Sequence, residues 1–321
     1  MVHLRIVAPR EKSQRVLDAL ERSVAVCNIV RLPDAARKPD GDMIICDVAR
    51  EAASIVISDL TELGIPTDGS VSIAPVETQL SDAAERADRA APGDPSNAVV
   101  WEEVEELTSE ASVITASYMI FMALACMIAA VGIFQNSSIL IVGSMILGPE
   151  FGPLAGLCVA IVGGRSHQAI RSALALGTGF PLGISAAFVA SLLFKWTGVA
   201  PHDFDGADHF LSDLISHPNV FSVAVALAAG IAGMLSLTTS KSATLLGVLV
   251  SVTTIPAAAN IGVSAAYGDG STWVGSQLQL AINLTCLIAA GIATLFVQRW
   301  IFNRRLRAHR SELAAEGVRH D

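Results

Sequence analysis

The 321-residue sequence has few charged and few aromatic side chains. Charged residues make up 16% of the chain and aromatic residues 5%, whereas 52% of the residues are hydrophobic. A typical soluble domain carries about 25% charged residues. The mean hydropathy is +0.54. The shortage of charge excludes an ordinary soluble protein and predicts an integral membrane protein, whose first partner is the lipid bilayer.

Basic residues and paired cysteines are also lacking. The chain has 21 Lys and Arg against 30 Asp and Glu, a net charge of −9, so we expect no nucleic-acid partner. The five cysteines occur singly with no CxxC pair, which argues against a zinc ribbon, a redox motif or a disulfide framework. The amino terminus lacks the apolar run of a signal peptide, so we expect it to stay in the cytosol.

Catalytic and cofactor motifs are missing as well. The long apolar segments contain no histidine and no aspartate, one of which an intramembrane serine or aspartic protease would need. The chain has no GxxxxGK[ST] nucleotide-binding loop. We therefore expect neither an enzyme nor a bound cofactor.

Residues 1–76 show the patterns of a small α+β domain. Apolar runs of strand length and helical periodicity alternate in the order β-α-β-β-α-β, and Gly64 and Pro66 end the second helix. This order is typical of the ferredoxin-like unit. The expected strands are 3–7, 24–30, 43–48 and 70–74, and the expected helices are 11–23 and 51–63.

Two connecting segments follow this domain. Residues 77–98 have almost no large apolar side chains, so we interpret them as a flexible linker. Residues 99–112 form an amphipathic juxtamembrane helix, with Trp101 near the membrane interface and five glutamates around an apolar stripe. One interpretation is a solvated helix that enters the membrane. The alternative is a self-associating neck, which favours a homo-oligomer.

Residues 113–297 are predicted to form a membrane domain of six spans. Basic residues between the segments, and in the basic tail 298–321, fall on one side if all six cross, and Lys195 falls on the other. Both termini are therefore expected in the cytosol of a multi-pass cell-membrane protein. The six segments are 113–134, 137–164, 169–194, 219–238, 242–266 and 273–297.

The second and fifth segments are interrupted. Residues 137–164 would form a helix of roughly 42 Å, longer than a hydrocarbon core of about 30 Å. The motif from Gly148 to Pro153 should break this helix, and residues 253–257 interrupt the fifth segment around Pro256. Breaks in the second and fifth of six spans predict an inverted repeat of three plus three helices, with the transport site at the breaks.

Glu150 is the only acidic residue in the six segments. An intramembrane carboxylate suggests a proton carrier, a cation ligand or a gate, and the alternative is a cap on the following half-helix. The half-helix amino termini favour an anionic solute, whereas Glu150 favours a cation, a zwitterion or a proton. The predicted solute- or ion-binding residues are Ser144, Gly148, Pro149, Glu150, Gly152, Pro153, Thr253, Thr254, Pro256, Asn260, Gln279 and Asn283.

The polar members of this set have a structural alternative. Asn260, Gln279 and Asn283 can serve only to hydrogen-bond neighbouring helices, and the hydroxyl groups can satisfy backbone groups freed at the breaks. A separate, weaker hypothesis concerns the outer loop, where His209, Asp213 and His217 recur every four residues. On a short helix they would share one face and could bind a metal ion; otherwise this face is solvated.

The motif Gly-Ser-Met-Ile-Leu-Gly-Pro-Glu-Phe-Gly-Pro at Gly143–Pro153, with Ile-Pro-Ala-Ala at Ile255–Ala258, resembles a known family. It is the family of prokaryotic hydrophobic membrane proteins catalogued as domain of unknown function 389. The resemblance covers about residues 112–296 and implies a multi-span membrane fold without a settled activity.

Together these features predict a secondary transporter or channel that moves a small solute or ion between the two broken spans. The ferredoxin-like domain would regulate it from the cytosol. The alternative is a membrane-anchored sensor whose ferredoxin-like domain binds an effector or a partner.

Overall fold

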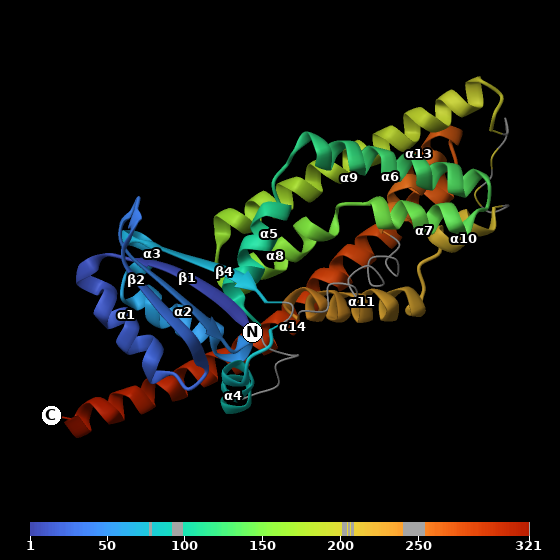
Figure 1. The fold of residues 1–321 in the computed structure, drawn as a ribbon. Coiled ribbons are helices and arrows are strands. Elements are labelled where there is room, and N and C mark those ends of the chain that lie inside the picture. The colour runs from blue at the N-terminus through green and yellow to red at the C-terminus, as the bar shows by residue number, and fades with distance from the viewer. Residues whose placement is uncertain are drawn as a thin grey trace. The chain divides into compact units, whose positions relative to one another are not determined.

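The computed structural model describes residues 1–76, 79–91, 99–200, 204, 206, 209–239 and 254–320 (Figure 1). Most of these residues are helical, and the strands are confined to the amino-terminal part. The chain divides into two compact units. The first unit contains Met1–Val104 and the residues from Arg305 onward, and the second contains Glu105–Arg304.

The first unit contains a four-stranded sheet in the order β2-β3-β1-β4, with every neighbouring pair antiparallel. β3 therefore lies between β1 and β2, which helix α1 connects, so the β-α-β unit is split as the predicted order requires. The strands are β1 (Val2–Ala8), β2 (Val26–Arg37), β3 (Asp40–Val48) and β4 (Ser70–Pro75).

Helices α1 (Arg10–Arg22) and α2 (Arg50–Glu62) cover one face of this sheet. Every second residue of β1 is buried, and these side chains share one apolar cluster with residues of both helices. Gly64 ends α2 in a left-handed conformation, as predicted. Pro66 does not simply stop the chain, because it lies in the first turn of a further short helix, α3 (Ile65–Asp68).

The interpretation of residues 77–98 as a flexible linker needs correction. Asp82–Ala90 form helix α4, which packs against β2 and β3. The Ser81 side chain caps its amino terminus, and Ala84 and Ala87 are buried. The composition was misleading because this helix packs through alanine rather than large apolar side chains. Residues 77–78 and 92–98 lie outside the described part of the chain.

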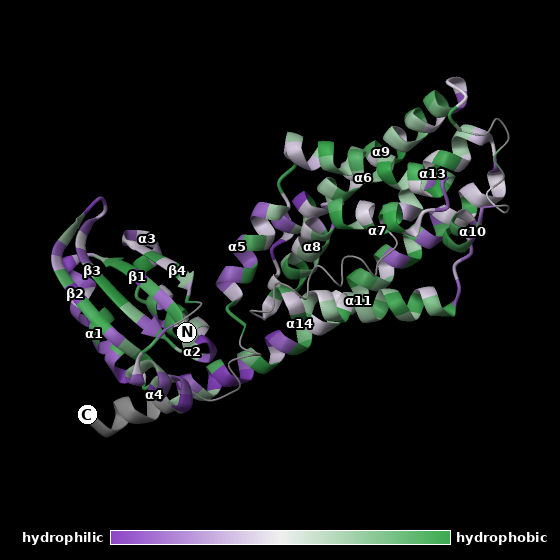
Figure 2. Ribbon diagram, turned by 45° about the vertical axis from the view of Figure 1, so that its right-hand side comes forward, coloured by the Kyte–Doolittle hydropathy of each residue, from purple (hydrophilic) through white to green (hydrophobic). Residues whose placement is uncertain are grey.

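The second unit contains the apolar helices (Figure 2). Four described helices are long and apolar enough to cross a membrane, and a bent helix pair makes a fifth candidate. The single helices are α6 (Ala116–Phe134), α9 (Ser166–Trp196), α11 (Val220–Thr238) and α14 (Gly270–His320), and the bent pair is α7 (Ser138–Leu147) with α8 (Phe151–Gly163). The chain is thus a membrane protein of mostly helical structure.

The predicted segment 242–266 is described only in part. Residues 240–253 lie outside the described residues, and Thr254–Tyr267 form α13. Fourteen helical residues are about 21 Å long, less than a hydrocarbon core of about 30 Å. A crossing at this position therefore remains a prediction, as do the six spans and the inverted repeat.

Small residues allow the helices around α13 to approach closely. A Cβ atom on Gly262 of α13 would lie 2.6 Å from the backbone oxygen of Ile184 in α9. A Cβ atom on Gly179 of α9 would likewise lie 2.4 Å from Tyr118 Oη of α6, and one on Gly183 would lie 2.6 Å from Cys126 Sγ, so these glycines allow the two helices to pack closely. The tight packing places the beginning of α13 beside the break between α7 and α8.

Candidate functional site

The predicted break in the second apolar segment is confirmed. α7 ends at Leu147 and α8 begins at Phe151, and the two helices are bent by 49°. The intervening residues are Gly148, Pro149 and Glu150, where proline removes a backbone donor. Gly152 and Pro153 lie in the first turn of α8, a position at which proline is tolerated.

The second predicted interruption is described only from Thr254 onward, where the described part of α13 begins. This helix begins at Thr254, and Pro256 lies in its first turn, as predicted. All residues from Thr254 to Ser264 are buried. Thr253, which was also predicted to contribute, lies outside the described residues.

A buried hydrogen bond joins these two helix ends. The Thr254 hydroxyl donates to Glu150 Oε1 over 2.7 Å. Glu150 is 6% exposed, and it precedes the first residue of α8 while contacting the first residue of α13. One carboxylate therefore lies at the amino ends of two helices, where the helix dipoles favour negative charge.

The other carboxylate oxygen of Glu150 is left without a partner. Oε2 is buried and accepts no hydrogen bond from any described residue. A buried oxygen without a hydrogen-bond donor costs about 1–3 kcal/mol, and more when it is charged. The site is thus half satisfied: one oxygen is held by Thr254, and the other can still accept a donor or a cation.

Gly148 makes this arrangement possible. A Cβ atom at this position would lie 2.3 Å from Glu150 Oε2 and 2.7 Å from Ile255 Cγ1. Distances below 3.0 Å are not tolerated without a shift, so any larger residue would displace the carboxylate or α13. The backbone conformation of Gly148 does not require glycine, because its φ of −65° suits any residue. Glycine is required here because a side chain would collide with Glu150 and Ile255.

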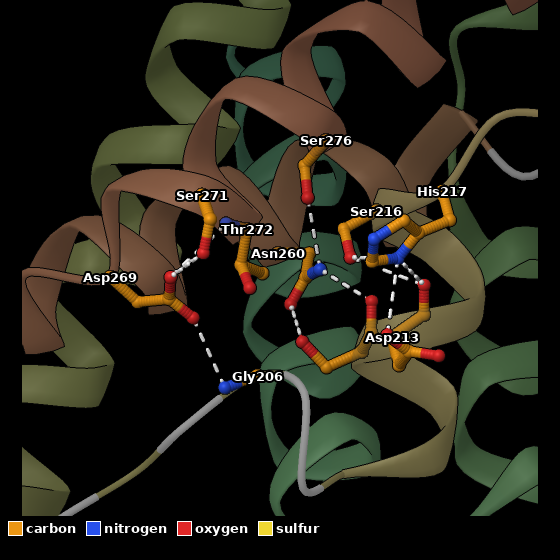
Figure 3. A network of polar contacts seen from close by, with 10 residues as sticks. Gly206, Asp213, Ser216, His217, Asn260, Asp269, Ser271, Thr272 and Ser276 are labelled. Carbon is orange, nitrogen blue, oxygen red and sulfur yellow. Dashed lines mark hydrogen bonds and ion pairs between the residues drawn. The ribbon is translucent and has the colours of Figure 1, made fainter.

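Asn260 holds three segments together (Figure 3). It is fully buried on α13; its Nδ2 donates to Ser276 Oγ of α14 over 2.9 Å and to the Ser212 backbone oxygen over 3.2 Å. The Ser212 hydroxyl donates to Asn260 Oδ1 over 2.9 Å. Ser212 belongs to α10 (Phe210–Ser216), so Asn260 connects α13 to α10 and α14. These contacts favour the structural interpretation of Asn260.

The remaining predicted polar residues fall into two groups. Ser144 is buried in α7 and donates to the backbone oxygen of Ile141 over 2.6 Å, so it satisfies a carbonyl of its own helix. Gln279 and Asn283 are buried on α14, and Gln279 Nε2 donates to Asn283 Oδ1 over 3.1 Å. Gln279 Oε1 is buried and has no hydrogen-bond partner in the described part of the chain.

The metal hypothesis for the outer loop is wrong. His217 Nδ1 approaches Asp213 Oδ1 to 3.1 Å, but the His209 ring packs against Phe204 at a centroid distance of 4.1 Å and an interplanar angle of 34°. No three His, Cys, Asp or Glu side chains among the described residues lie close enough to hold a metal ion. α10 spans only Phe210–Ser216, so both histidines flank the helix and the expected common face does not form.

Sequence analysis missed a buried ion cluster around Glu105. Glu105 of α5 (Trp101–Ala111) is 8% exposed, although its helix was expected to present its glutamates to solvent. Its carboxylate pairs with Arg165 and, at 3.2 Å, with Arg299. Because the two arginines lie 60 and 194 residues further along the chain, no local pattern could have revealed them.

Asp269 is a second polar feature that the sequence did not indicate. Its Oδ1 accepts from the Thr272 amide over 3.1 Å and the Ser271 hydroxyl over 2.8 Å, and its Oδ2 accepts from the Gly206 amide over 3.1 Å (Figure 3). Burial raises the pKa of Asp269, but these hydrogen bonds outweigh burial and hold it at about 2. Asp269 thereby caps α14 and connects it to the outer loop.

The first unit contains its own polar cluster, on β3. Asp47 accepts hydrogen bonds from Asn28 over 2.8 Å and Gln79 over 2.7 Å, and its Oδ1 lies 2.7 Å from His3 Nδ1. Burial raises the pKa of Asp47, but these hydrogen bonds lower it below its usual value. Both carboxylate oxygens are satisfied, so the cluster connects β1, β2, β3 and the segment before α4.

Comparisons with known proteins agree with the resemblance found in the motifs. Residues 145–289 match the family described as "Domain of unknown function (DUF389)". A protein of Methanocaldococcus jannaschii described as uncharacterized is 23% identical over 215 residues, which is 63% of this chain. The chain spans 62% of that relative's length. No solved structure matches the chain.

Proposed function

Because this chain belongs to the family with the domain of unknown function DUF389, we propose its function from its own geometry: it is a membrane transport protein. It is a secondary transporter or channel that moves a small solute or ion between the two interrupted helices. The observation that carries the proposal is the buried bond from Thr254 to Glu150, which joins the break after α7 to the beginning of α13.

Two physical arguments support this function. Non-helical backbone at membrane depth is tolerated only where protein surrounds it or where it lines a watery cavity. The residues Gly148–Glu150 are such a stretch, and they contain the only acidic side chain between Val113 and Gly164. Acidic side chains in such positions are costly, and they mark ion pathways and proton relays in other transporters.

The proposal extends to the topology. Six spans, with residues 242–266 as the fifth, make two inverted halves of three, and the interrupted helices then occupy matching positions. The excess of arginine and lysine on one side gives cytosolic termini in the cell membrane. The amino-terminal sheet regulates transport from the cytosol, and the protein works as a homo-oligomer.

The test is flux through the pure protein in liposomes. Currents and internal pH are recorded against a panel of small anions, cations, amino acids and proton gradients. Glu150→Gln should reduce flux at least tenfold, since it removes the only charge at the break. Glu106→Gln is the matched control, because Glu106 is exposed on α5 and the change also removes one negative charge.

A second measurement separates transport from anchoring. Cysteines are introduced one at a time at residues 149–153 of a cysteine-free chain and treated with a water-soluble thiol reagent. Labelling would support a hydrated path at the break. Protection at every position, together with no flux across the panel, would overturn the proposal and favour a membrane-anchored sensor whose amino-terminal sheet binds an effector.

A further inference from the structure

The sign of the solute's charge is left open by the sequence, and the unpartnered buried oxygens bear on it. Three side chains of the apolar helices each have one hydrogen-bonded polar atom and one buried oxygen without a partner among the described residues. They are Glu150, with Oε2, Gln279, with Oε1, and Gln298, with Oε1. Gln298 lies 19 residues beyond Gln279 on α14, about 28 Å along the helix, so it is remote from Gln279. Glu150 is 6% exposed and Gln279 is 4% exposed, so bulk water does not satisfy either oxygen.

Helix geometry brings Gln279 to a level near that of Thr254, the residue that is hydrogen-bonded to Glu150. Only Gly268 and Asp269 connect α13 to α14, and the bond from Asn260 to Ser276 then requires the two helices to run antiparallel, side by side. Three residues along each helix from this bond, about 4.5 Å, bring Gln279 level with Ala257. Three residues further along each helix, residue 282 of α14 is level with Thr254 of α13. The level of Thr254 therefore lies between those of Gln279 and Asn283.

The packing of apolar residues places the same helices around this level. One buried apolar cluster includes residues of all these helices. Its members include Ile255 and Ala257 of α13, Leu280 of α14, and Met145 and Leu154 on either side of the break. α14 at Gln279, the beginning of α13 and the break itself therefore share a single core. Glu150 and Gln279 are buried close to members of this cluster along the chain, four residues before Leu154 and directly before Leu280.

The chemistry of these atoms selects the charge of the ligand. Burial disfavours the ionised form of Glu150, whereas the amino ends of α8 and α13 favour it, and a cation bound at Oε2 would keep the carboxylate ionised. In that form Oε2 is only an acceptor. Gln279 Oε1 is a carbonyl oxygen and therefore also only an acceptor, and the amide nitrogen of the same side chain donates to Asn283 Oδ1. The carboxylate already occupies the place at the helix amino ends that an anionic solute would need.

We propose that Glu150 Oε2 and Gln279 Oε1 bind a singly charged cation, either an alkali metal ion or the ammonium group of an organic solute. This proposal deepens the proposed transport function by naming the charge class that enters the break. One carboxylate balances one positive charge. A divalent ion would leave a net charge in the core, and an anion would meet Glu150 without a donor.

The test is binding to the full chain in detergent, which does not depend on flux. Thermal unfolding is followed at constant ionic strength while N-methylglucamine chloride is replaced by sodium, potassium, lithium, ammonium or methylammonium chloride. We expect a saturable rise in the unfolding temperature with at least one small cation. A response to the alkali ions identifies a metal ion, and a response only to ammonium or methylammonium identifies an amine.

Two variants connect the response to the two oxygens. Glu150→Gln should abolish the rise, and Gln279→Met, which keeps the length of the side chain, should weaken the apparent affinity at least tenfold. Glu106→Gln should respond like the parent chain. If Glu150→Gln does not fold, Gln279→Met still tests the assignment, since it changes no charge.

Other outcomes decide between this inference and the transport proposal. An unfolding temperature that is the same in all cations, or that follows the anion when chloride is exchanged for gluconate or sulfate, would overturn the cation site. If liposomes then carry an anion, transport stands and only the charge class is wrong. A cation response that needs Glu150, without any flux, supports the cation site and instead contradicts transport.

Discussion

Two glutamates are buried in the second unit, and their surroundings differ sharply. Glu105 is 8% exposed and pairs with two arginines, Arg165 and Arg299. Glu150 is 6% exposed and accepts one hydrogen bond from the Thr254 hydroxyl. Its other carboxylate oxygen has no hydrogen-bond partner among the described residues. A compensated buried acid holds helices together, whereas an uncompensated one costs stability and is retained where a protein binds or moves charge.

Asp269 provides a third point of comparison. Both of its oxygens accept hydrogen bonds, from α14 and from Gly206, and its pKa is held at about 2. Neither Glu105 nor Asp269 leaves an acceptor open among the described residues. The contrast therefore predicts structural roles for Glu105 and Asp269 and a binding role for Glu150, and the following substitutions test it.

The largest loss of stability should come from Glu105→Gln. The change removes the negative charge that holds α5 to α9 and α14, and we expect it to cost about 2–3 kcal/mol. The two arginines are partly exposed and can turn toward water, so the cost stays below that of a fully buried pair. Unfolding in mixed micelles with increasing dodecyl sulfate measures it, with Glu106→Gln as the control. If Glu105→Gln lowers the free energy of unfolding no more than Glu106→Gln does, the structural role of Glu105 is contradicted.

Gly148→Ala should be the next most damaging change. The added methyl group overlaps Glu150 Oε2 and Ile255, and we expect about 1–3 kcal/mol of destabilisation from overpacking, together with a loss of flux. The matched control is Gly143→Ala, because no atom lies within 4 Å of a Cβ atom at that position of α7. The control should be neutral or slightly stabilising. Equal effects of the two changes would show that the close approach is not required.

Asp269 should contribute a smaller, pH-dependent stabilisation of about 1 kcal/mol. Its folded pKa of about 2 lies below the value of about 3.9 for an unfolded aspartate. The contribution is therefore complete above about pH 4 and is lost as the pH falls toward 2. Unfolding of the parent chain and of Asp269→Asn between pH 6 and 2 measures this. The parent's advantage should shrink only in that window, and a constant difference would contradict the assigned pKa.

The smallest effect on stability should come from Glu150→Gln, although we expect this change to reduce flux at least tenfold. Glutamine keeps an oxygen that can accept from Thr254, and the change removes an uncompensated buried charge, so we expect a change within about 1 kcal/mol. The same unfolding assay, beside the liposome assay, separates stability from function. If Glu150→Gln instead destabilised the protein as much as Glu105→Gln and left flux unchanged, the two glutamates would share a structural role.

The features that could be predicted from the sequence are local ones. The interruption at Gly148–Pro153 follows from prolines and glycines within one segment, and the order of strands and helices in residues 1–76 follows from hydrophobic periodicity. Helix α4 was missed because alanines bury a face without a strong apolar signal. The prediction of a metal site was wrong because it assumed one helix from His209 to His217. Helix α10 is too short to include either histidine, so the spacing of four residues does not place them on one helix face.

The sequence by itself determined that this is a membrane protein of long apolar helices, that one of these helices is broken, and that an isolated acid lies at the break. Those properties depend on composition and on neighbours along the chain. Only the tertiary structure decided that Glu150 meets Thr254, 104 residues away, that Glu105 meets Arg165 and Arg299, and that Gln279 keeps an open oxygen. Contacts between distant residues depend on how helices pack, and packing is set by the shapes of all the helices together.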